Sequence, residues 1–462
     1  MHEEAIIHLR KIFSDEGIIR VITHLDTDGL SSGAIITHTL KKHNQNFWLS
    51  TVKQLEDGML DKLLVEAQKQ KWKALFFLDL GSSKLNKIKE FARHLPLFVI
   101  DHHELDPLFE QEDSLRDNMF FISNYQYKEN MSASCLAYLL VKELDKTNKR
   151  LSQLAILGLI GDILDRNFGK NVQAIIEDAR ENGMQLRRGL TVFSAMRPIH
   201  KALEFSSNIF IPGVTGNSNG AVSMLRDLGI EIRNSQGYRT MLDLSKDEMS
   251  ALITAILLRR ASYNSTEEII NNIYLIKVAG HLWDSREMST MLNACGRMGY
   301  SSMAIAFLTG SKRARDKIQD VYTKYKHHII QGLNTVDSIK QVNEKYVVIN
   351  ARNMIKDTII GTIISITASS FLYKEGTVIV GMAYRKDGKV KVSARIVKSR
   401  GKSNEDSEIN LDGILRSIIR VTGGEVGGHL NAAGCLISKA KEKEFLELLD
   451  KKMSTEEIKI TI

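Results

Sequence analysis

Short apolar runs alternate with helical patterns through residues 19–165, and this alternation restricts the fold more than any other feature of the sequence. Helices are expected at about 31–42, 60–69 and 84–93, between runs that are rich in β-branched and aromatic residues. The four runs are IIRVIT, FWLSTV, ALFFLDL and LPLFVI. Strands that alternate with helices form βαβ units. The sequence therefore predicts an α/β fold with a mostly parallel sheet.

Acidic residues and histidines stand where these apolar runs stop. Parallel strands end on a common edge of the sheet, so residues just past several strand ends can converge. Gathered carboxylates and imidazoles repel one another without cations, which favours a divalent-metal site. The candidates are His24, Asp26, Asp28, Asp79, Asp101, His102, His103 and Asp162.

The first candidates lie in the segment HLDTDG. If the chain is still extended there, His24, Asp26 and Asp28 point to one side. Aspartate is a hard ligand that suits Mg²⁺ or Mn²⁺, and imidazole shifts the preference toward Mn²⁺. Taken alone, however, Asp and Gly after a strand are more often turn and N-cap residues.

Two further motifs strengthen the metal-site interpretation. His102 and His103 follow LPLFVI directly, and a surface turn needs no imidazole. Asp79 also fits a helix cap, whereas Asp162 follows an apolar helical run, where an unpaired carboxylate is costly. Asp165, almost one turn later, is the competing candidate, but Asp162 directly ends the run.

Composition limits the class of protein. A chain of 462 residues is expected to form two or three domains. The net charge is +8 although acids are concentrated at one place, which favours a polyanionic partner; a mild lysine excess is also common in proteins that bind none. Cys135, Cys295 and Cys435 show no CxxC pairing, and no stretch is apolar enough to span a membrane. We expect buried thiols, no membrane association and a cytoplasmic protein.

The sequence divides into three regions. Residues 1–170 contain the strand and helix alternation, and residues 171–340 are expected to be a mainly helical middle region. Its segment LSKDEMSALITAILLRR begins with a capping-box pattern, Ser245 with Glu248. In residues 341–462 the β pattern returns as a smaller α/β domain, with a hairpin turn at RKDGK, the glycine-rich GGEVGGHLNAAG and a polar helix.

The ordered motifs resemble a known family. HLDTDG, the Asp79 element, DHH at 101–103 and GD at 161–162 resemble the four motifs of the DHH phosphoesterase superfamily. GGHLNAAG at 427–434, preceded by VSARIV, is similar to the signature of the DHH-associated C-terminal domain. The layout resembles the archaeal RecJ-like nucleases, including the GINS-associated and Hef-associated groups, and REMSTMLNACGRMG at 286–299 also resembles that group.

The resemblance implies a site with two divalent metal ions, with Mn²⁺ favoured and Mg²⁺ as the alternative. One ion would be held by His24, Asp26 and Asp79. The other would be held by Asp28, Asp79, His102 and Asp162, so that Asp79 bridges the two. Asp101 would orient an imidazole, and His103 would face the scissile phosphate.

The C-terminal domain supplies candidate substrate-binding residues. Glycines such as Gly427 and Gly428 let backbone amides approach an anion, and His429 is a donor to phosphate. Arg395 and Ser393 should share one strand face, and the resemblance places the arginine at a substrate phosphate. Leu430 stands where the family often has proline. For Arg352 and Arg385 a solvated strand face is favoured, and for Tyr125, Tyr127 and Tyr384 packing is favoured over base stacking.

Three functions are compatible with these features. The leading one is a RecJ-like exonuclease on single-stranded DNA or RNA in replication or repair, docked on a GINS or Hef-type complex or acting alone or as a homo-oligomer. The second is a phosphodiesterase for small substrates, namely oligoribonucleotides, cyclic dinucleotides or phosphoadenosine phosphate. The third is a scaffold in a replication complex, against which the complete set of candidate ligands argues.

Overall fold

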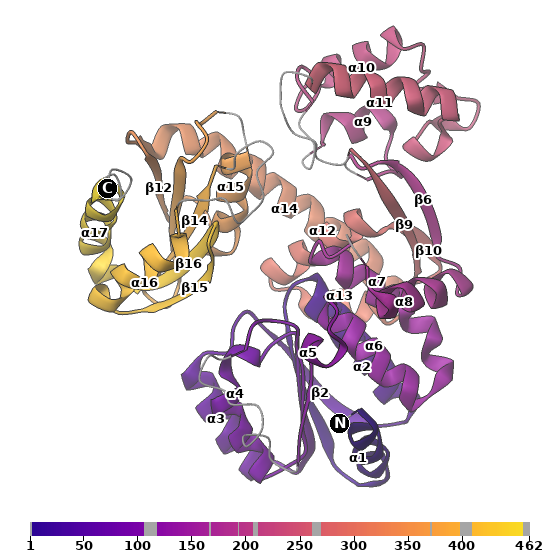
Figure 1. Cartoon of the computed structure of the whole chain (residues 1–462), viewed down its shortest axis with the longest axis vertical. Helices are drawn as coiled ribbons and strands as arrows, with labels where there is room; N and C mark the ends of the chain where they lie inside the picture. Colours follow the sequence, from indigo (N-terminus) through magenta and orange to yellow (C-terminus); the bar gives the residue numbers. More distant parts are fainter. Residues whose placement is uncertain are drawn as a thin grey trace. The chain divides into compact units, whose positions relative to one another are not determined.

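The computed structural model describes residues 2–105, 118–165, 168–192, 194–206, 211–260, 269–369, 372–397 and 409–455 (Figure 1). The chain forms two compact units. The first contains Met1–Ile253 and Ile269–Tyr322, and the second contains Thr254–Glu268 and Thr323–Ile462. Each unit is described separately below.

The first unit contains a five-stranded parallel sheet in the order β2-β1-β3-β4-β5. Its strands are β1 (Ile18–His24), β2 (Asn46–Val52), β3 (Trp72–Leu78), β4 (Leu97–Ile100) and β5 (Met119–Ile122). Strands β4 and β5 are buried along their whole length, because helices cover both faces of the sheet. The predicted parallel α/β fold is confirmed.

Helices cover the two faces of this sheet in two groups (Figure 1). One face carries α3 (Asp57–Lys69) and the short α4 (Leu85–Ile88), and the other carries α1 (His2–Ser14), α2 (Thr27–Lys42) and α6 (Ala133–Leu144). The helix predicted at about 31–42 begins four residues earlier than expected, at Thr27. The helix predicted at about 84–93 is α4 extended by 3₁₀ turns at Ser82–Lys84 and Lys89–Arg93.

The middle of the chain contains more β structure than expected. Strands β6 (Gln185–Leu190), β9 (Ile270–Val278) and β10 (His281–Asp284) form an antiparallel sheet in the order β10-β9-β6. Sequence analysis missed this sheet because QLRRGL and INNIYLIKV lack strict apolar alternation. A two-stranded hairpin joins β7 (Arg233–Asn234) to β8 (Gly237–Tyr238).

The other middle elements are helical. The expected capping box at α11 (Lys246–Arg260) is present, since the Ser245 amide donates to Glu248 and the Glu248 amide donates to Ser245 Oγ. The remaining helices are α5 (Asn124–Tyr127), α7 (Ser152–Gly161), α8 (Lys170–Glu181), α9 (Ile199–Glu204), α10 (Ser218–Asp227), α12 (Ser285–Arg297), α13 (Ser301–Leu308) and α14 (Lys312–Ile339).

The second unit is built on a six-stranded mixed sheet in the order β11-β12-β13-β14-β16-β15. Only the β12–β13 pair among these is parallel. The strands are β11 (Lys340–Val342), β12 (Tyr346–Arg352), β13 (Val378–Tyr384), β14 (Lys389–Ile396), β15 (Glu425–His429) and β16 (Ala432–Ser438). The predicted hairpin at RKDGK joins β13 to β14 and is confirmed.

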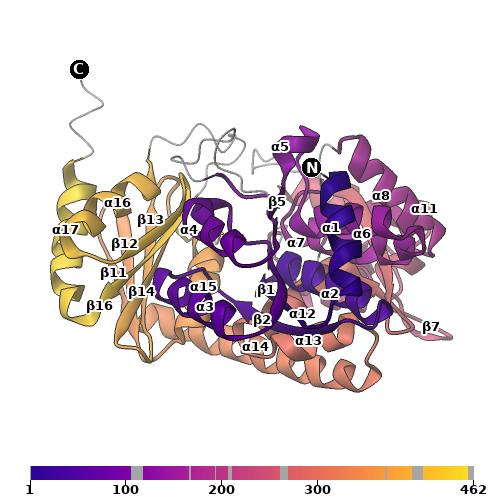
Figure 2. The ribbon, with the colours of Figure 1, turned by 90° about the horizontal axis from the view of Figure 1, so that it is seen from below.

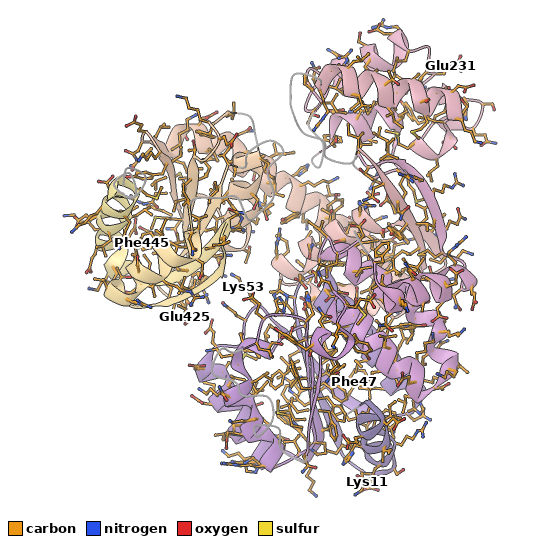
Figure 3. All side chains as sticks on the ribbon, in the orientation of Figure 1. Lys11, Phe47, Lys53, Glu231, Glu425 and Phe445 are labelled. Carbon is orange, nitrogen blue, oxygen red and sulfur yellow. The ribbon has the colours of Figure 1, made fainter. Side chains whose placement is uncertain are left out.

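Three helices accompany this second sheet (Figure 2). They are α15 (Asp357–Ser369), α16 (Leu411–Thr422) and α17 (Glu442–Thr455). Helices α16 and α17 pack on the sheet through an apolar core in which Phe445, labelled in Figure 3, is fully buried. The glycine-rich segment forms the β15–β16 hairpin.

Two expectations from composition can be compared with the structure. Cys135, Cys295 and Cys435 are free and buried, as expected. Among the residues that the structure describes, no helix has both the length and the apolar character that a membrane crossing requires.

Helices α2, α6 and α7 lie side by side, and one glycine allows their close approach (Figures 1 and 2). A Cβ atom added to Gly158 of α7 would lie 2.1 Å from Ser134 Oγ and 2.2 Å from Asp28 Oδ1. Neither neighbour is free to move, because Ser134 and Asp28 are both buried and hydrogen-bonded to each other's segments. Packing at Gly158 therefore fixes the position of Asp28.

We predict that Gly158→Ala lowers the free energy of unfolding by about 1–3 kcal/mol, because the added methyl group overpacks the contact between three helices. Thermal unfolding of the full chain measures this. Gly58→Ala on α3 is the matched control, since a Cβ there would have nothing within 4 Å. It should leave stability unchanged or raise it by about 0.5–1 kcal/mol. Equal stability of the two variants would contradict the close packing at Gly158.

Candidate metal centre

The carboxyl edge of the parallel sheet gathers most of the candidate residues. His24 is the last residue of β1, Asp79 follows β3, and Asp101 follows β4. The backbone amide of Asp79 donates to the carbonyl of Ile100, and that of Asp101 donates to the carbonyl of Ile122. Because these backbone hydrogen bonds set the register of neighbouring strands, the three residues lie side by side along the carboxyl edge of the sheet.

The HLDTDG segment turns into a helix and does not continue as a strand, which corrects the expectation that alternation aligns its side chains. Asp26 is the N-cap of α2, where its Oδ1 accepts from the Gly29 amide at 3.1 Å, and Asp28 lies in the first helical turn. A Cβ at Gly29 would lie 2.4 Å from the carbonyl oxygen of His24, so this tight turn requires glycine. The turn brings all three side chains to the strand end.

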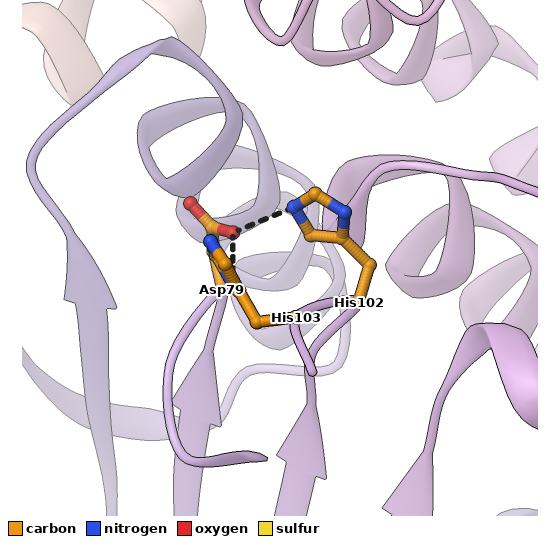
Figure 4. A group of neighbouring side chains, drawn as sticks. All are labelled: Asp79, His102 and His103. Atoms are coloured by element: carbon orange, nitrogen blue, oxygen red, sulfur yellow. Dashed lines mark ion pairs between the residues drawn. The ribbon is translucent and has the colours of Figure 1, made fainter. Parts of the chain in front are cut away.

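Asp79 lies between two groups of donor atoms. Its Oδ2 is 3.4 Å from His24 Nδ1, which is 2.9 Å from Asp26 Oδ2. Its Oδ1 is 3.4 Å from His102 Nε2. Figure 4 draws this contact as a dashed line. His102 Nε2 lies 3.1 Å from Asp162 Oδ2 and 3.9 Å from Asp28 Oδ2. The two oxygens of one buried carboxylate thus face two separate groups.

In each group the donor atoms lie within 4.8 Å of one another. The first group is His24, Asp26 and Asp79, and the second is Asp28, Asp79, His102 and Asp162. The members of these groups coincide with the two ligand sets that the motif resemblance implies. Their function as ligands remains a prediction.

Several of these ligand atoms are buried and, among the described residues, make only the ion-pair contacts given above and no hydrogen bond. They are His24 Nδ1, His102 Nε2, Asp162 Oδ2 and both carboxylate oxygens of Asp79. Buried polar atoms are rarely left without a hydrogen bond, and leaving one unsatisfied costs about 1–3 kcal/mol. Imidazole nitrogens and carboxylate oxygens are ligands of Mn²⁺ and Mg²⁺. The residues therefore fit divalent cations.

The electrostatics of the metal-free site also favour cations. Burial, together with the charges of Asp26 and Asp28, raises the pKa of Asp79 to about 6. Burial and the charge of Asp28 raise the pKa of Asp162 well above its ordinary value. Burial opposes protonation of His102, but contacts with Asp162 and Asp79 outweigh it and raise its pKa to about 12. Protons thus partly neutralise a site that carries excess negative charge.

Asp28 is held from a second direction. It is fully buried, and its carboxylate accepts the amides of Ala133 at 2.6 Å and Ser134 at 3.0 Å. These amides belong to the first turn of α6, where the helix dipole stabilises an anion. Asp28, a member of the second group of donor atoms, therefore links the N-terminus of α2 to that of α6.

Asp101 contacts the histidine pair and lies outside both donor groups. It accepts hydrogen bonds from the amides of Ser82 at 2.8 Å and His102 at 2.9 Å, and from His103 Nδ1 at 2.7 Å. The bond to Asp101 raises the pKa of His103, whose side chain is 52% exposed. His103 also lies within range of Asp79 and His102 as a third combination of donors. This geometry is that of an oriented imidazole that faces solvent.

Asp165, the alternative to Asp162, lies elsewhere. Its carboxylate is paired with Arg286 of α12, whose guanidinium also donates to the carbonyl of Asn272. Asp162 instead ends α7 as its C-cap and contacts His102. The structure thus brings Asp162 into the donor cluster and gives Asp165 a cationic partner outside it.

Sequence analysis missed the contribution of α12 to this site. Asn293 Oδ1 accepts the backbone amide of Thr27 at 2.9 Å, and the carbonyl of Ser289 accepts the Thr27 hydroxyl at 2.8 Å. A Cβ at Gly296 would lie 1.9 Å from the carbonyl oxygen of Leu25. Helix α12 therefore fixes the turn between Asp26 and Asp28. REMSTMLNACGRMG marked this segment in the sequence, but its partner lies more than 250 residues away.

In the second unit, Arg395 and Ser393 lie on β14. Arg395 Nε donates to Ser365 Oγ of α15 at 3.1 Å, and Ser393 is buried against the same helix near Gly361. The two residues thus share a face, as predicted. Arg395 remains half-buried.

The glycine-rich candidates lie on the β15–β16 hairpin. Gly427 pairs with Gly434 and Gly428 pairs with Ala433. A Cβ at Gly428 would lie 2.4 Å from Ala433 Cα, so the hairpin requires glycine there. The side chain of His429 lies outside the part of the structure that is described.

The weaker candidates contact protein groups or solvent. Tyr384 donates to Glu442 at 2.8 Å, and Arg385 is paired with Asp387. Arg352 and Tyr125 are exposed, and Tyr127 is partly buried. These contacts are those of packing and solvated faces.

Comparison with known families identifies three domain models in this chain. Residues 18–161 match the DHH family N-terminal domain, residues 194–274 match the DHH-CID domain, and residues 343–455 match the DHHA1 domain. Together these models match more than half of the chain. An uncharacterised protein of Methanocaldococcus jannaschii is 28% identical over 449 residues, which cover 95% of this chain and 94% of the relative.

Solved structures share the fold at low sequence identity. CDC45 from Entamoeba histolytica matches with a TM-score of 0.65 and 11% identity, covering 98% of this chain and 99% of its own. The exonuclease RecJ bound to manganese matches with a TM-score of 0.59 and 14% identity, covering 98% of this chain and 94% of its own.

We predict that Asp79→Asn stabilises the metal-free protein at pH 8 by a few degrees, because it removes a buried negative charge. The folded-state pKa of Asp79 is raised from 3.8 to about 6, so its ionisation destabilises the fold above that pH. The gain should shrink as the pH falls from 6 toward 4, where wild-type Asp79 also becomes neutral. Thermal unfolding in EDTA measures it.

With Mn²⁺ the order should reverse, because wild type gains stability from the ion and Asp79→Asn does not. Asp61→Asn, at an exposed surface pair with Lys87, is the control and should follow wild type in both conditions. Equal Mn²⁺ stabilisation of wild type and Asp79→Asn would remove Asp79 from the metal centre.

Proposed function

Because this chain belongs to the DHH superfamily, as its motifs predict, we propose that it is a metal-dependent phosphodiesterase. Within that class we propose a RecJ-like exonuclease that hydrolyses single-stranded DNA or RNA in replication or repair. The observation that carries this proposal is the placement of Asp79, whose two buried oxygens face two separate groups of donors. One carboxylate so placed can bridge two cations.

We assign two ions to the site. His24, Asp26 and Asp79 would hold one ion, and the other would be held by Asp28, Asp79, His102 and Asp162. Two divalent ions supply an activated water and neutralise charge on a phosphoryl group. Mn²⁺ is favoured because two imidazoles are present, and Mg²⁺ is the alternative.

The remaining residues of the edge would position the substrate. Asp101 holds Nδ1 of His103, which leaves Nε2 of that ring to donate to a phosphate oxygen. The raised pKa of His103 favours the protonated, donating form. In the metal centre Asp28 and Asp79 are nearly fully buried, which keeps water from competing for them.

The second unit would bind substrate phosphates through Arg395, Ser393, His429 and the amides of Gly427 and Gly428. Ser365 orients the Arg395 guanidinium, and a planar guanidinium suits a phosphate. We accordingly propose a catalytic domain at residues 1–170, a middle region at 171–340 and a substrate-binding domain at 341–462. The net charge of +8 supports a polyanionic substrate.

A replication or repair complex is the proposed partner, as the motif resemblance implies. The three cysteines are free, which is typical of a reducing compartment, so the proposed location is the cytoplasm.

The experiment is a length series of single-stranded DNA and RNA oligonucleotides, labelled at the 5′ or the 3′ end, incubated with Mn²⁺ or Mg²⁺. Stepwise shortening of 20-nucleotide strands is expected, and chelation of the metal ion should stop it. Asp79→Ala should reduce hydrolysis by at least about 1,000-fold while the far-UV spectrum is unchanged, because the bridging ligand is lost. Asp61→Ala is the control and should retain full activity.

Cleavage restricted to dinucleotides and trinucleotides would replace this proposal with a small-substrate phosphodiesterase. Absence of hydrolysis on every substrate and with both metals would favour a scaffold.

We predict that Arg395→Ala raises KM for an oligonucleotide about tenfold and changes kcat less, because a charge-assisted contact to phosphate is worth about 1.5–3 kcal/mol. Arg416→Ala, at a surface pair with Asp412 on α16, is the matched control in the same unit. Arg395→Lys should recover part of the loss through its charge. An unchanged KM in Arg395→Ala would exclude the phosphate contact.

A further inference from the structure

A second polar pocket lies in the first unit, apart from the metal centre. It has a volume of about 310 Å³ and is formed by β10, the first turn of α12, the start of α14 and the segment around Arg197. Its polar lining residues include Arg197, His281, Trp283, Asp284, Glu287 and Arg315. Acids and bases are both present, so its ligand preference depends on which of them already have protein partners.

The two acids of the pocket are committed to the protein. Asp284 accepts the Ala195 amide at 2.8 Å and caps α12 by accepting the Arg286 amide at 2.9 Å. Glu287 accepts from Arg197 Nε at 2.6 Å and is nearly buried. Both carboxylates therefore have internal donors and contribute little to binding a cation.

The donors of the pocket are less satisfied. Trp283 Nε1 is buried and has no hydrogen-bond partner among the described residues, while its ring packs edge-on against Phe307. Arg315 donates to His281 Nε2 at 2.6 Å, which makes this nitrogen an acceptor and leaves Nδ1 as the protonated donor. The other contact of Arg315 is a surface pair with Asp316, which is 77% exposed and therefore weak.

The hydrogen-bonding groups that this pocket offers to a ligand are thus N–H donors, and the ligand that accepts from them is an anion. Arg315 lies in the basic first turns of α14, which also carry Lys312, Arg313 and Lys317. Lys312, three residues before Arg315, lies on the same side of the helix, and neighbouring cations favour a polyanion over an isolated anion. Trp283 and His281 add ring surfaces of the kind that accompany phosphate contacts in single-strand binding.

Helix α12 connects this pocket to the metal centre. Glu287 lies at the pocket, and Asn293 binds the Thr27 amide beside the donor groups. At 1.5 Å per residue these two positions are about 9 Å apart along the helix. That is the length of roughly three nucleotides in a stacked strand, at about 3.4 Å each.

We propose that this pocket binds a backbone phosphate of a single-stranded nucleic acid while another part of the same strand is at the metal centre. The inference rests on the proposed function for the identity of the strand. Arg315 is the principal phosphate donor, and Trp283 Nε1 is the second. The pocket would favour strands of several nucleotides over dinucleotides.

The test compares full-length wild type, Arg315→Gln and Trp283→Phe in binding a fluorescent 20-residue single strand in EDTA, where no hydrolysis occurs. Arg315→Gln should weaken binding about tenfold and reduce the salt dependence by about one released counterion. Trp283→Phe keeps the ring and removes only the N–H donor, so it should weaken binding about threefold or more. Arg226→Gln, at an exposed position of α10, is the matched control and should bind like wild type.

A second measurement separates the pocket from the metal centre. With Mn²⁺, Arg315→Gln should hydrolyse a dinucleotide at the wild-type rate and lose only its advantage on long strands. Wild-type affinity and salt dependence in Arg315→Gln would overturn the proposal.

The outcomes also distinguish this inference from the proposed function. If wild type hydrolyses no substrate but Arg315→Gln still binds the strand more weakly, the pocket is supported and the nuclease assignment fails. If wild type hydrolyses long strands and Arg315→Gln does so with unchanged KM, the nuclease assignment is supported and the pocket assignment fails.

Discussion

Negative charge at a buried sheet edge is the constraint on which the rest of this structure depends. Asp28 and Asp79 are almost inaccessible to solvent, Asp26 lies 2.9 Å from the His24 imidazole, and Asp162 lies 3.1 Å from the His102 imidazole. Such a cluster is unfavourable without positive charge. The surrounding fold holds it in place through helix N-termini, an N-cap and backbone amides. The clustered negative charge lowers the stability of this region, and the same charge makes the site attractive to cations.

Much of this arrangement could be predicted from the sequence, and the reason is topological. His24, Asp79 and Asp101 directly follow or end apolar runs, and parallel strands bring such positions to one edge. The positions of Asp26 and Asp28 could be predicted less directly from the sequence. Their convergence depends on where β1 ends: the strand stops at His24, four residues before Asp28, and Gly29 lets α2 begin close against that strand end.

Other features could not be predicted because they depend on distant contacts. The hydrogen bond from Thr27 to Asn293 joins segments that no local pattern relates. Strands β6 and β9 lack alternation because β9, the central strand of the sheet, is buried at consecutive positions, while β6 is largely exposed up to Arg188. The glycine-rich segment formed a hairpin because Gly427 and Gly428 permit close strand pairing opposite Gly434 and Ala433.

The packing of α12 against Leu25 and Thr27 also bears on how the protein matures. The turn that carries Asp26 and Asp28 is synthesised early, whereas the helix that fixes it emerges only after residue 297. A nascent chain would therefore hold these candidate metal ligands in an incompletely ordered turn until about two thirds of the protein has been synthesised. Binding of an ion by them in the final geometry would then be a late event, coupled to the folding of the whole first unit.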